Sequence, residues 1–343
     1  MPVPTNYLDF LKRTLIVVAV AVIPVLIWYL FGVVLIAFGA IILAMLLRLV
    51  AQPLMRWLAL PEWAALTVSG LVILGVIAGT GYLFGSRISS EFQDVVQRTS
   101  AESAALEDSM RGTVLGNYIL QHLISGNFSL ADVLPGVIKV STTFLEGVLI
   151  MLISGAYLAA QPHLYRRGLI WLFPPSRHAR AAEIYDGISE ALRLWLIGQL
   201  VEMVLIGALT TFVVWIIGVP SPLAIGLIAG IGEFIPYLGP ILAAIPAVLV
   251  AITNSPETAL WTILAYLVIH QFEGQVVAPL IQRHMVAIPP AVMLLGIVAI
   301  TYLFGAIAII FAAPIVVTLF AAVNLLYVRD TLGEKTTFTR KLG

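Results

Sequence analysis

Four glutamates lie in a part of the chain that has no permanently cationic side chain. Between Arg193 and Arg283 the sequence contains no lysine or arginine. The acidic residues that it keeps there are Glu202, Glu233, Glu257 and Glu273. All but Glu257 lie inside or beside long apolar runs, where a carboxylate is costly unless it is protonated, paired or facing a water-filled cavity. The region is therefore typical of a path for cations, protons or polar solutes.

Two of these acids have neighbours that could help them to bind a solute. Gln199 precedes Glu202 by three residues, so both lie on one helical face and can hold a proton or a cation. The alternative is a protonated Glu202 carboxyl that is hydrogen-bonded between helices. Glu233 precedes a helix break, and we expect it either to bind a cation with carbonyls freed there or to hold the break by hydrogen bonds. A monovalent cation is the ion expected at Glu202 and Glu233, and no metal site is predicted.

A second polar cluster contains His270, Gln271 and Glu273. Histidine titrates near neutral pH, so His270 suits a proton relay with Glu273. The alternative is an interfacial pair at a helix end. Tyr237 and Tyr302 occupy matching positions in two broken apolar segments and can offer hydroxyls to a polar substrate, although tyrosines are also common at membrane interfaces.

Composition places these residues in a membrane. The 343-residue chain is 61% hydrophobic and 10% charged, with a mean hydropathy of +1.05, whereas a soluble domain is roughly half apolar and a quarter charged. The alternation typical of β-barrel strands is absent, which predicts an all-α integral membrane protein. The net charge of zero argues against nucleic-acid binding. No catalytic or nucleotide-binding motif is found, so neither an enzyme nor a cofactor is predicted.

About eight hydrophobic segments follow one another. The first three spans are predicted at about Leu15–Phe31, Val33–Leu47 and Ala64–Phe84. Gly32 makes a tight hairpin between the first two, and glycines at small-xxx-small spacing in the third favour close helix packing. Residues 1–85 are thus a scaffold of three membrane helices.

An amphipathic helical insert occupies residues 86–143 and is expected outside the bilayer. Glycines and Pro135 are expected to break it into pieces. It can rest on the membrane, cover the core or meet another subunit. A fourth span at about Phe144–Ala160 and an arginine-rich link form the unit 144–193, in which Ser176 is predicted to cap the next helix.

Basic residues set the orientation. The arginine-rich link, the N-terminus and the tail 329–343 are expected in the cytoplasm. The insert, with four basic and six acidic residues, is then on the opposite side. The prediction is a multi-pass membrane protein with both termini cytoplasmic.

Residues 194–328 are predicted to be a transport core with two broken helical hairpins. A fifth span, Leu194–Ile217, precedes an apolar run interrupted at Pro236–Pro240, where two prolines and Gly239 leave backbone groups unpaired. The tip of this re-entrant hairpin is expected near Tyr237–Gly239.

A span at Thr258–Val277 precedes a second run, which is expected to break at Thr301–Gly305 and again at Pro314. Gly305 is the residue of this break that we assign to the site. The predicted core therefore repeats one unit, a spanning helix followed by a broken hairpin, and the second copy is inverted relative to the first. Many secondary transporters build a midplane site from such inverted repeats. The alternative is chance similarity between apolar segments rich in glycine and proline.

Two motifs carry a family resemblance. Residues 231–241 read IGEFIPYLGPI and residues 270–279 read HQFEGQVVAP. Both motifs and the layout of nearly the whole chain resemble the AI-2E family of bacterial permeases. The resemblance implies an inner-membrane transporter that exports autoinducer-2 or exchanges sodium for protons. It also implies a homo-oligomer, with a pentamer as the candidate stoichiometry, and an elevator-like mobile part.

The predicted function is secondary-active transport of a small polar solute, such as autoinducer-2, or of a monovalent cation in exchange for protons. The expected partners are membrane lipid, the solute or H⁺ and Na⁺, and further copies of the chain. The alternative is a passive channel, or a scaffold that organises partners through the insert. The residues predicted to bind substrate or ion are Gln199, Glu202, Glu233, Pro236, Tyr237, Gly239, Pro240, His270, Gln271, Glu273, Tyr302 and Gly305.

Overall fold

The computed structural model describes residues 30–76, 78–79, 130–282 and 288–329, with single positions at 14, 22, 82 and 332. These residues form helices joined by short turns, and no strand occurs among them, which confirms the all-α prediction. Four helices are long and apolar enough to cross a membrane, and a bent pair of helices can supply a fifth. The four are Phe31–Trp57, Pro175–Ile217, Pro256–Ile281 and Ala306–Val328.

The N-terminal part contains two described helices. Helix α2 (Phe31–Trp57) contains the predicted second span and continues beyond it through Pro53. Gly32 lies in its first turn, while the predicted first span lies almost wholly outside the described residues. The helix Glu62–Val76 matches the start of the third span. Its Ala65 and Ser69 are completely buried.

Helix α5 (Leu130–Ala160) contains the fourth span and the last part of the predicted insert. The break predicted at Pro135 is wrong, because α5 is continuous through this residue. The rest of the insert lies outside the described residues. Helix α5 packs against α2, where Gly155 would bring a Cβ within 2.8 Å of Leu43. Helix α6 (Pro162–Trp171) then turns by 91° from the last part of α5.

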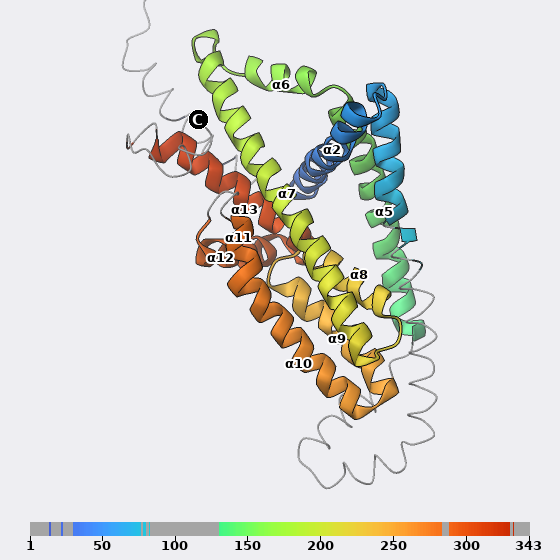
Figure 1. Cartoon of the computed structure of the whole chain (residues 1–343). Coiled ribbons are helices and arrows are strands. Elements are labelled where there is room, and N and C mark those ends of the chain that lie inside the picture. The colour runs from blue at the N-terminus through green and yellow to red at the C-terminus, as the bar shows by residue number, and fades with distance from the viewer. Residues whose placement is uncertain are drawn as a thin grey trace, which may run out of the picture.

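Helix α7 (His178–Ile217) packs against α2, α12 and α13 in one part of its length and against α8, α9 and α10 in another. In Figure 1 it runs from α6 at one end to α8 at the other. It includes the predicted fifth span but begins well before it. Ser176 is not its cap, because Pro175–Arg177 form a short 3₁₀ turn (η2) and Arg177 holds the N-cap position without a side-chain bond. Gly218 ends α7 in the left-handed conformation (φ 85°), which is common for a glycine that follows a helix.

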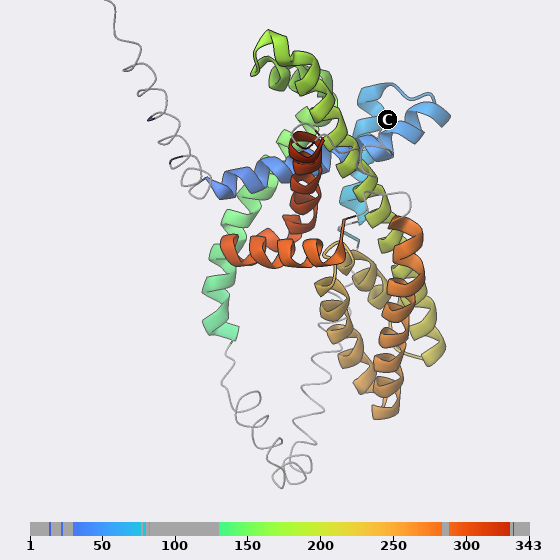
Figure 2. The same cartoon turned by 90° about the vertical axis from the view of Figure 1, so that its left-hand side faces the viewer.

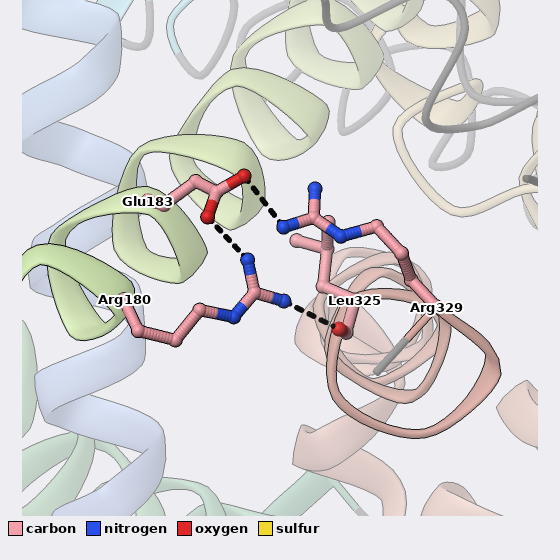
Figure 3. A network of polar contacts seen from close by, with 4 residues as sticks. All are labelled: Arg180, Glu183, Leu325 and Arg329. Carbon is pink, nitrogen blue, oxygen red and sulfur yellow. Dashed lines mark hydrogen bonds and ion pairs between the residues drawn. The ribbon is translucent and has the colours of Figure 1, made fainter. Parts of the chain in front are cut away.

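The arginines of the predicted link are paired with acids on α7. Arg166 makes two hydrogen bonds with Asp186, at 2.8 and 2.6 Å. Figure 3 shows a second group, in which Glu183 contacts both Arg180 and Arg329. Arg180 also donates to the backbone oxygen of Leu325 at 2.9 Å. The first part of α7 is therefore tied both to α6 and to the last described helical segment.

The first broken segment is a helical hairpin of α8 (Pro222–Gly232) and α9 (Leu238–Asn254). The break lies at residues 233–237, so it overlaps the predicted interruption at Pro236–Pro240 but begins three residues earlier, and Gly239 and Pro240 lie in the first turn of α9. Helix α8 also packs very closely on α7, since a Cβ on Gly226 would lie 2.5 Å from the backbone oxygen of Gly207. Small residues permit this backbone approach, as is common between membrane helices.

Helix α10 (Pro256–Phe272) continues into a π-helical segment η3 (Glu273–Val277) and α11 (Ala278–Gln282). The second broken segment consists of α12 (Pro290–Phe304), a 3₁₀ turn η4 (Ala306–Ala308) and α13 (Ile309–Val323). The π-helical η5 (Asn324–Val328) ends it. In Figure 2, α12 (orange) lies horizontally and α13 (dark red) stands upright.

The break predicted near Thr301–Gly305 is found at Gly305 (φ 88°), whereas the break predicted at Pro314 is wrong. Helix α13 continues through Pro314, which is buried. A proline removes one backbone donor, and membrane helices tolerate this where neighbouring groups compensate.

Two apolar clusters hold the helices around the site. The larger joins α2, α7, α12 and α13 and includes Leu196, Ile297 and Val317. The second joins α7 to α8, α9 and α10 and includes Val214, Ile225 and Tyr266. The site lies on α7 between these clusters.

Candidate substrate and ion site

A cavity of about 500 Å³ opens between α7, the α8–α9 hairpin, the α10–α11 helices and the start of α12. Three glutamates and one histidine line it, together with a glutamine and a tyrosine. No lysine or arginine is among the described residues that line it. Most of the remaining wall is apolar. This volume is in the range of small-molecule sites.

Helix α7 supplies one wall of the cavity. Trp195, Gln199 and Glu202 follow one another at helical spacing, so all three face the cavity. Gln199 is 4% exposed, and its Nε2 donates to the backbone oxygen of Glu233 at 2.7 Å. Gln199 therefore bonds to the hairpin, while it lines the same cavity as Glu202. Gln199 holds one of the carbonyls that the helix break exposes.

The hairpin tip places Glu233 at the bottom of the cavity. Glu233 is the C-cap residue of α8, and its N–H donates to the backbone oxygen of Ala229 at 3.1 Å. It is only 2% exposed, and its Oε1 has no hydrogen-bond partner among the described residues. The backbone therefore fixes Glu233 at the break. Its carboxyl shares a hydrogen bond with Glu273, and its Oε1 is left to bind a proton or a cation.

Two further hairpin residues explain how sharp the tip is. Tyr237 has a φ of 67°, a strained conformation for a side chain of this size. Gly239 is buried, and a Cβ there would lie 1.7 Å from the backbone oxygen of Gly232. Pro236 and Pro240 line the cavity on either side of the tip. The tip thus depends on close backbone contact between α8 and α9.

Helix α10 and η3 supply the facing wall. His270 Nδ1 lies 2.8 Å from Glu273 Oε2, and both side chains are partly buried. Their spacing of three residues permits this contact on a helix. The helix continues past Glu273 through η3, so the pair is inside a long helix and not at a helix end. His270 Nε2 is buried without a hydrogen-bond partner among the described residues.

The three carboxyl groups act on one another across the cavity. A negative charge on Glu202 or on Glu273 repels a negative charge on Glu233. Glu273 and Glu202 repel each other in the same way. One potential ligand atom each from Glu233, His270 and Glu273 lies within 4.8 Å of the other two. Carboxylates this close, without a cationic side chain, are stable together only when they share protons or a cation.

Four of the twelve residues predicted for the site lie outside the lining of the cavity. Gln271 is exposed on α10, Tyr302 is 88% exposed, and Gly305 ends α12. Tyr302 therefore does not repeat the role of Tyr237, which lines the cavity. Gly239 supports the tip from behind. The remaining eight predicted residues share the cavity.

Sequence reasoning missed the apolar part of the lining, which includes Trp195, Leu267, Ile281, Ile288 and Met293. Their residue types do not distinguish most of them from the many apolar residues that face lipid or pack in the core. Trp195 and Leu267 carried a signal, since each lies about one turn before a predicted site residue, Gln199 and His270 respectively.

Comparison with known proteins agrees with this architecture. The family model described as "AI-2E family transporter" matches residues 15–327. The chain belongs to the AI-2E transporter family. An AI-2E family protein is a transporter, which agrees with the membrane-spanning helices described above. The resemblance drawn from the motifs at residues 231–241 and 270–279 is therefore confirmed.

Other AI-2E-like proteins are similar over part or most of the chain. Two are from Bacillus subtilis: "Putative transport protein YrrI", 29% identical over 46% of this chain and 45% of its own length, and "Putative transport protein YueF", 27% identical over 46% and 43%. The matched stretch spans less than half the length of either Bacillus protein. A "Putative transport protein" of Thermotoga maritima is 22% identical over 81% of this chain and 86% of its own length.

Proposed function

We propose that this protein is a secondary-active transporter in which the cavity between α7, the α8–α9 hairpin and α10 holds the transported species. The observation that carries this proposal is the Glu233 carboxyl, which is 2% exposed and keeps one oxygen without a partner among the described residues. It lines a cavity at a helix break, which is where transporters place substrate and coupling-ion sites. A purely structural glutamate would use both carboxyl oxygens in hydrogen bonds.

The cargo that we propose is a small polar solute of the autoinducer-2 kind, or a monovalent cation exchanged for protons. The family supports transport, and the acidic cavity supports a cationic or hydrogen-bonding species. Glu202 is the proposed proton carrier. The titratable groups that face it from the neighbouring elements are Glu233, Tyr237, His270 and Glu273.

The moving part in this proposal is the hairpin together with the adjacent part of α7. Glycine contacts hold α8 to α7, so the two are expected to move together past α2 and α5 in an elevator-like motion. We further propose an inner-membrane location with cytoplasmic termini and assembly into homo-oligomers. The arginines on α6 and on the first part of α7 support that orientation, because cytoplasmic loops carry an excess of arginine and lysine.

Flux in proteoliposomes tests the proposal. Vesicles with purified protein are loaded with sodium, lithium or potassium, or with a diffusible signal furanone, and efflux is measured with and without a pH gradient. Wild-type protein is expected to drive uphill flux of one of these species when the gradient is applied. Glu202→Gln, which cannot release a proton, is expected to abolish the dependence of flux on the pH gradient.

The matched control is Glu257→Gln, because Glu257 is exposed at the start of α10 and outside the cavity lining. It is expected to leave flux and its pH profile unchanged. Conductance that needs no gradient would indicate a passive channel and contradict the proposal. Flux with an unchanged pH profile in Glu202→Gln would remove Glu202 from the mechanism.

A further inference from the structure

We propose that Glu233, His270 and Glu273 form a binding site for a divalent transition-metal cation of the Zn²⁺ or Mn²⁺ kind. The site shares its cavity with the proposed transport path. It does not depend on transport, because metal binding is an equilibrium that can be measured without flux.

The distances are close to those of a metal site. One potential ligand atom from each residue lies within 4.8 Å of the other two. Nitrogen and oxygen ligands bind Zn²⁺ at about 2.0–2.2 Å, so two ligands of one ion are at most about 4.4 Å apart. Small side-chain rotations close the difference. The ligands come from the end of α8, from α10 and from η3, so they are set by separate helical elements.

The burial of Glu233 is an independent observation that points to a ligand. Its side chain is almost completely buried, lines the cavity and keeps Oε1 without a partner among the described residues. The cationic side chain that would normally satisfy such a carboxylate is missing from the described lining of the cavity. A bound cation would satisfy it, because a buried carboxylate is stable when it coordinates a metal.

The His270 ring is held beside the Glu273 carboxylate. Its Nδ1 contacts the Glu273 carboxylate at 2.8 Å, and its Nε2 is buried with no partner among the described residues. In the proposed site the ion lies between His270 and Glu273 and takes the place of this direct contact. The Tyr266 ring, 5.8 Å away between centroids, restricts the imidazole further. Glu273 opens the π-helical segment η3, and π-helical turns occur frequently at functional sites.

The donor set selects the class of ion. Sites for Mg²⁺ and Ca²⁺ use oxygen ligands, whereas imidazole suits Zn²⁺ and its neighbours in the transition series. One imidazole and two carboxylates therefore favour a transition metal over a purely oxygen-seeking cation. Three protein ligands leave a coordination position open toward the cavity, as in zinc sites that exchange their fourth ligand.

Calorimetric titration of the purified, chelator-treated full chain in detergent with ZnCl₂ and MnCl₂ tests this site. One metal ion per chain is expected to bind. Glu233→Gln and His270→Gln are expected to weaken binding by roughly 10–100-fold or more, which is the scale for loss of groups at a metal site. The matched controls are Glu257→Gln and His163→Gln, which change an exposed residue of the same type and are expected to bind like the wild type.

Co²⁺ gives a second readout that does not depend on heats of binding. Its visible absorption bands report coordination by protein ligands, and they are expected in the wild type and absent in Glu233→Gln. Glu233→Gln keeps the size of the side chain and carries no charge to bury, so it is the variant that is expected to remain folded. Size-exclusion chromatography of each variant checks this.

Equal affinity for Zn²⁺ in the wild type and in both cavity variants would overturn the proposal. Displacement of Zn²⁺ by an equal concentration of Mg²⁺ or Na⁺ would also overturn it, because the site would then be one for oxygen-seeking cations. Flux that fails while metal binding persists would contradict only the transport proposal.

Discussion

The hairpin tip is the feature that a single methyl group can test most directly. Gly239 is the second residue of α9 and faces the last turn of α8. A Cβ at Gly239 would lie 1.7 Å from the backbone oxygen of Gly232 and 2.3 Å from its carbonyl carbon. Real Cβ atoms essentially never approach closer than 3.0 Å, and both contacting atoms are backbone. In Gly239→Ala the two helices must therefore separate by more than about 1 Å.

The expected penalty is that of overpacking a filled interior, about 1–3 kcal/mol. At about 2–4 °C per kcal/mol, the apparent unfolding midpoint in detergent should fall by roughly 2–12 °C. Gly239 does not have a positive φ, so strain of an alanine backbone adds nothing to this figure. The separation also moves Glu233, the next residue after Gly232, so flux should fall at temperatures where the protein remains folded.

Gly168→Ala is the matched control, because a Cβ at Gly168 on α6 would meet no atom within 4 Å among the described residues. It should leave the midpoint unchanged or raise the free energy of unfolding by about 0.5–1 kcal/mol, since alanine is the better helix former. Differential scanning fluorimetry at one scan rate compares the two variants. A midpoint in Gly239→Ala equal to that of Gly168→Ala would refute the close-contact account of the tip.

Three other substitutions have effects that follow from single contacts. Gln199→Ala leaves the buried backbone oxygen of Glu233 without its donor and should cost about 1–3 kcal/mol, with faster amide exchange at the tip by mass spectrometry; unchanged exchange would contradict this role. Ser255→Ala removes the hydroxyl that accepts the Thr258 N–H at 3.0 Å and caps α10, so thermal unfolding should show a loss of about 0.5–2 kcal/mol, whereas Ser255→Asn should restore most of it. Glu183→Gln breaks exposed ion pairs and should cost no more than about 1 kcal/mol, less in high salt; a larger loss in the same assay would mean that these contacts hold the fold together.

The first helix break could be predicted from the sequence because it follows from covalent structure. Pro236 and Pro240 lack a backbone donor, and Gly239 permits close backbone contact, so an apolar helix cannot continue there. Pro314 gave the same signal and was misread. One proline removes a single hydrogen bond, and α13 keeps the helix because packed neighbours surround this residue. Local sequence therefore located the breaks at Pro236–Pro240 and at Gly305, whereas a single proline inside a packed helix did not mark one.

The site was predictable in part. The contact of His270 with Glu273 follows from their spacing on a helix, and the burial of Glu233 follows from its apolar surroundings. What brings Glu233 to this pair is the packing of α8 and α9 against α10, and no local pattern encodes that. The same limit explains Tyr302, whose sequence surroundings resemble those of Tyr237 but whose side chain is 88% exposed.

The length of α7 has a mechanical consequence. Forty residues at 1.5 Å each make a rod of about 60 Å, which is about twice the thickness of the hydrocarbon layer. One end carries the acidic partners of Arg166 and Arg329, and Glu202 lies farther along the same rod. A tilt of about 5° about one end would displace the other by about 5 Å, roughly one helical turn. An event at the charged end, such as contact with lipid headgroups or another protein, would therefore reach the cavity through a single continuous lever.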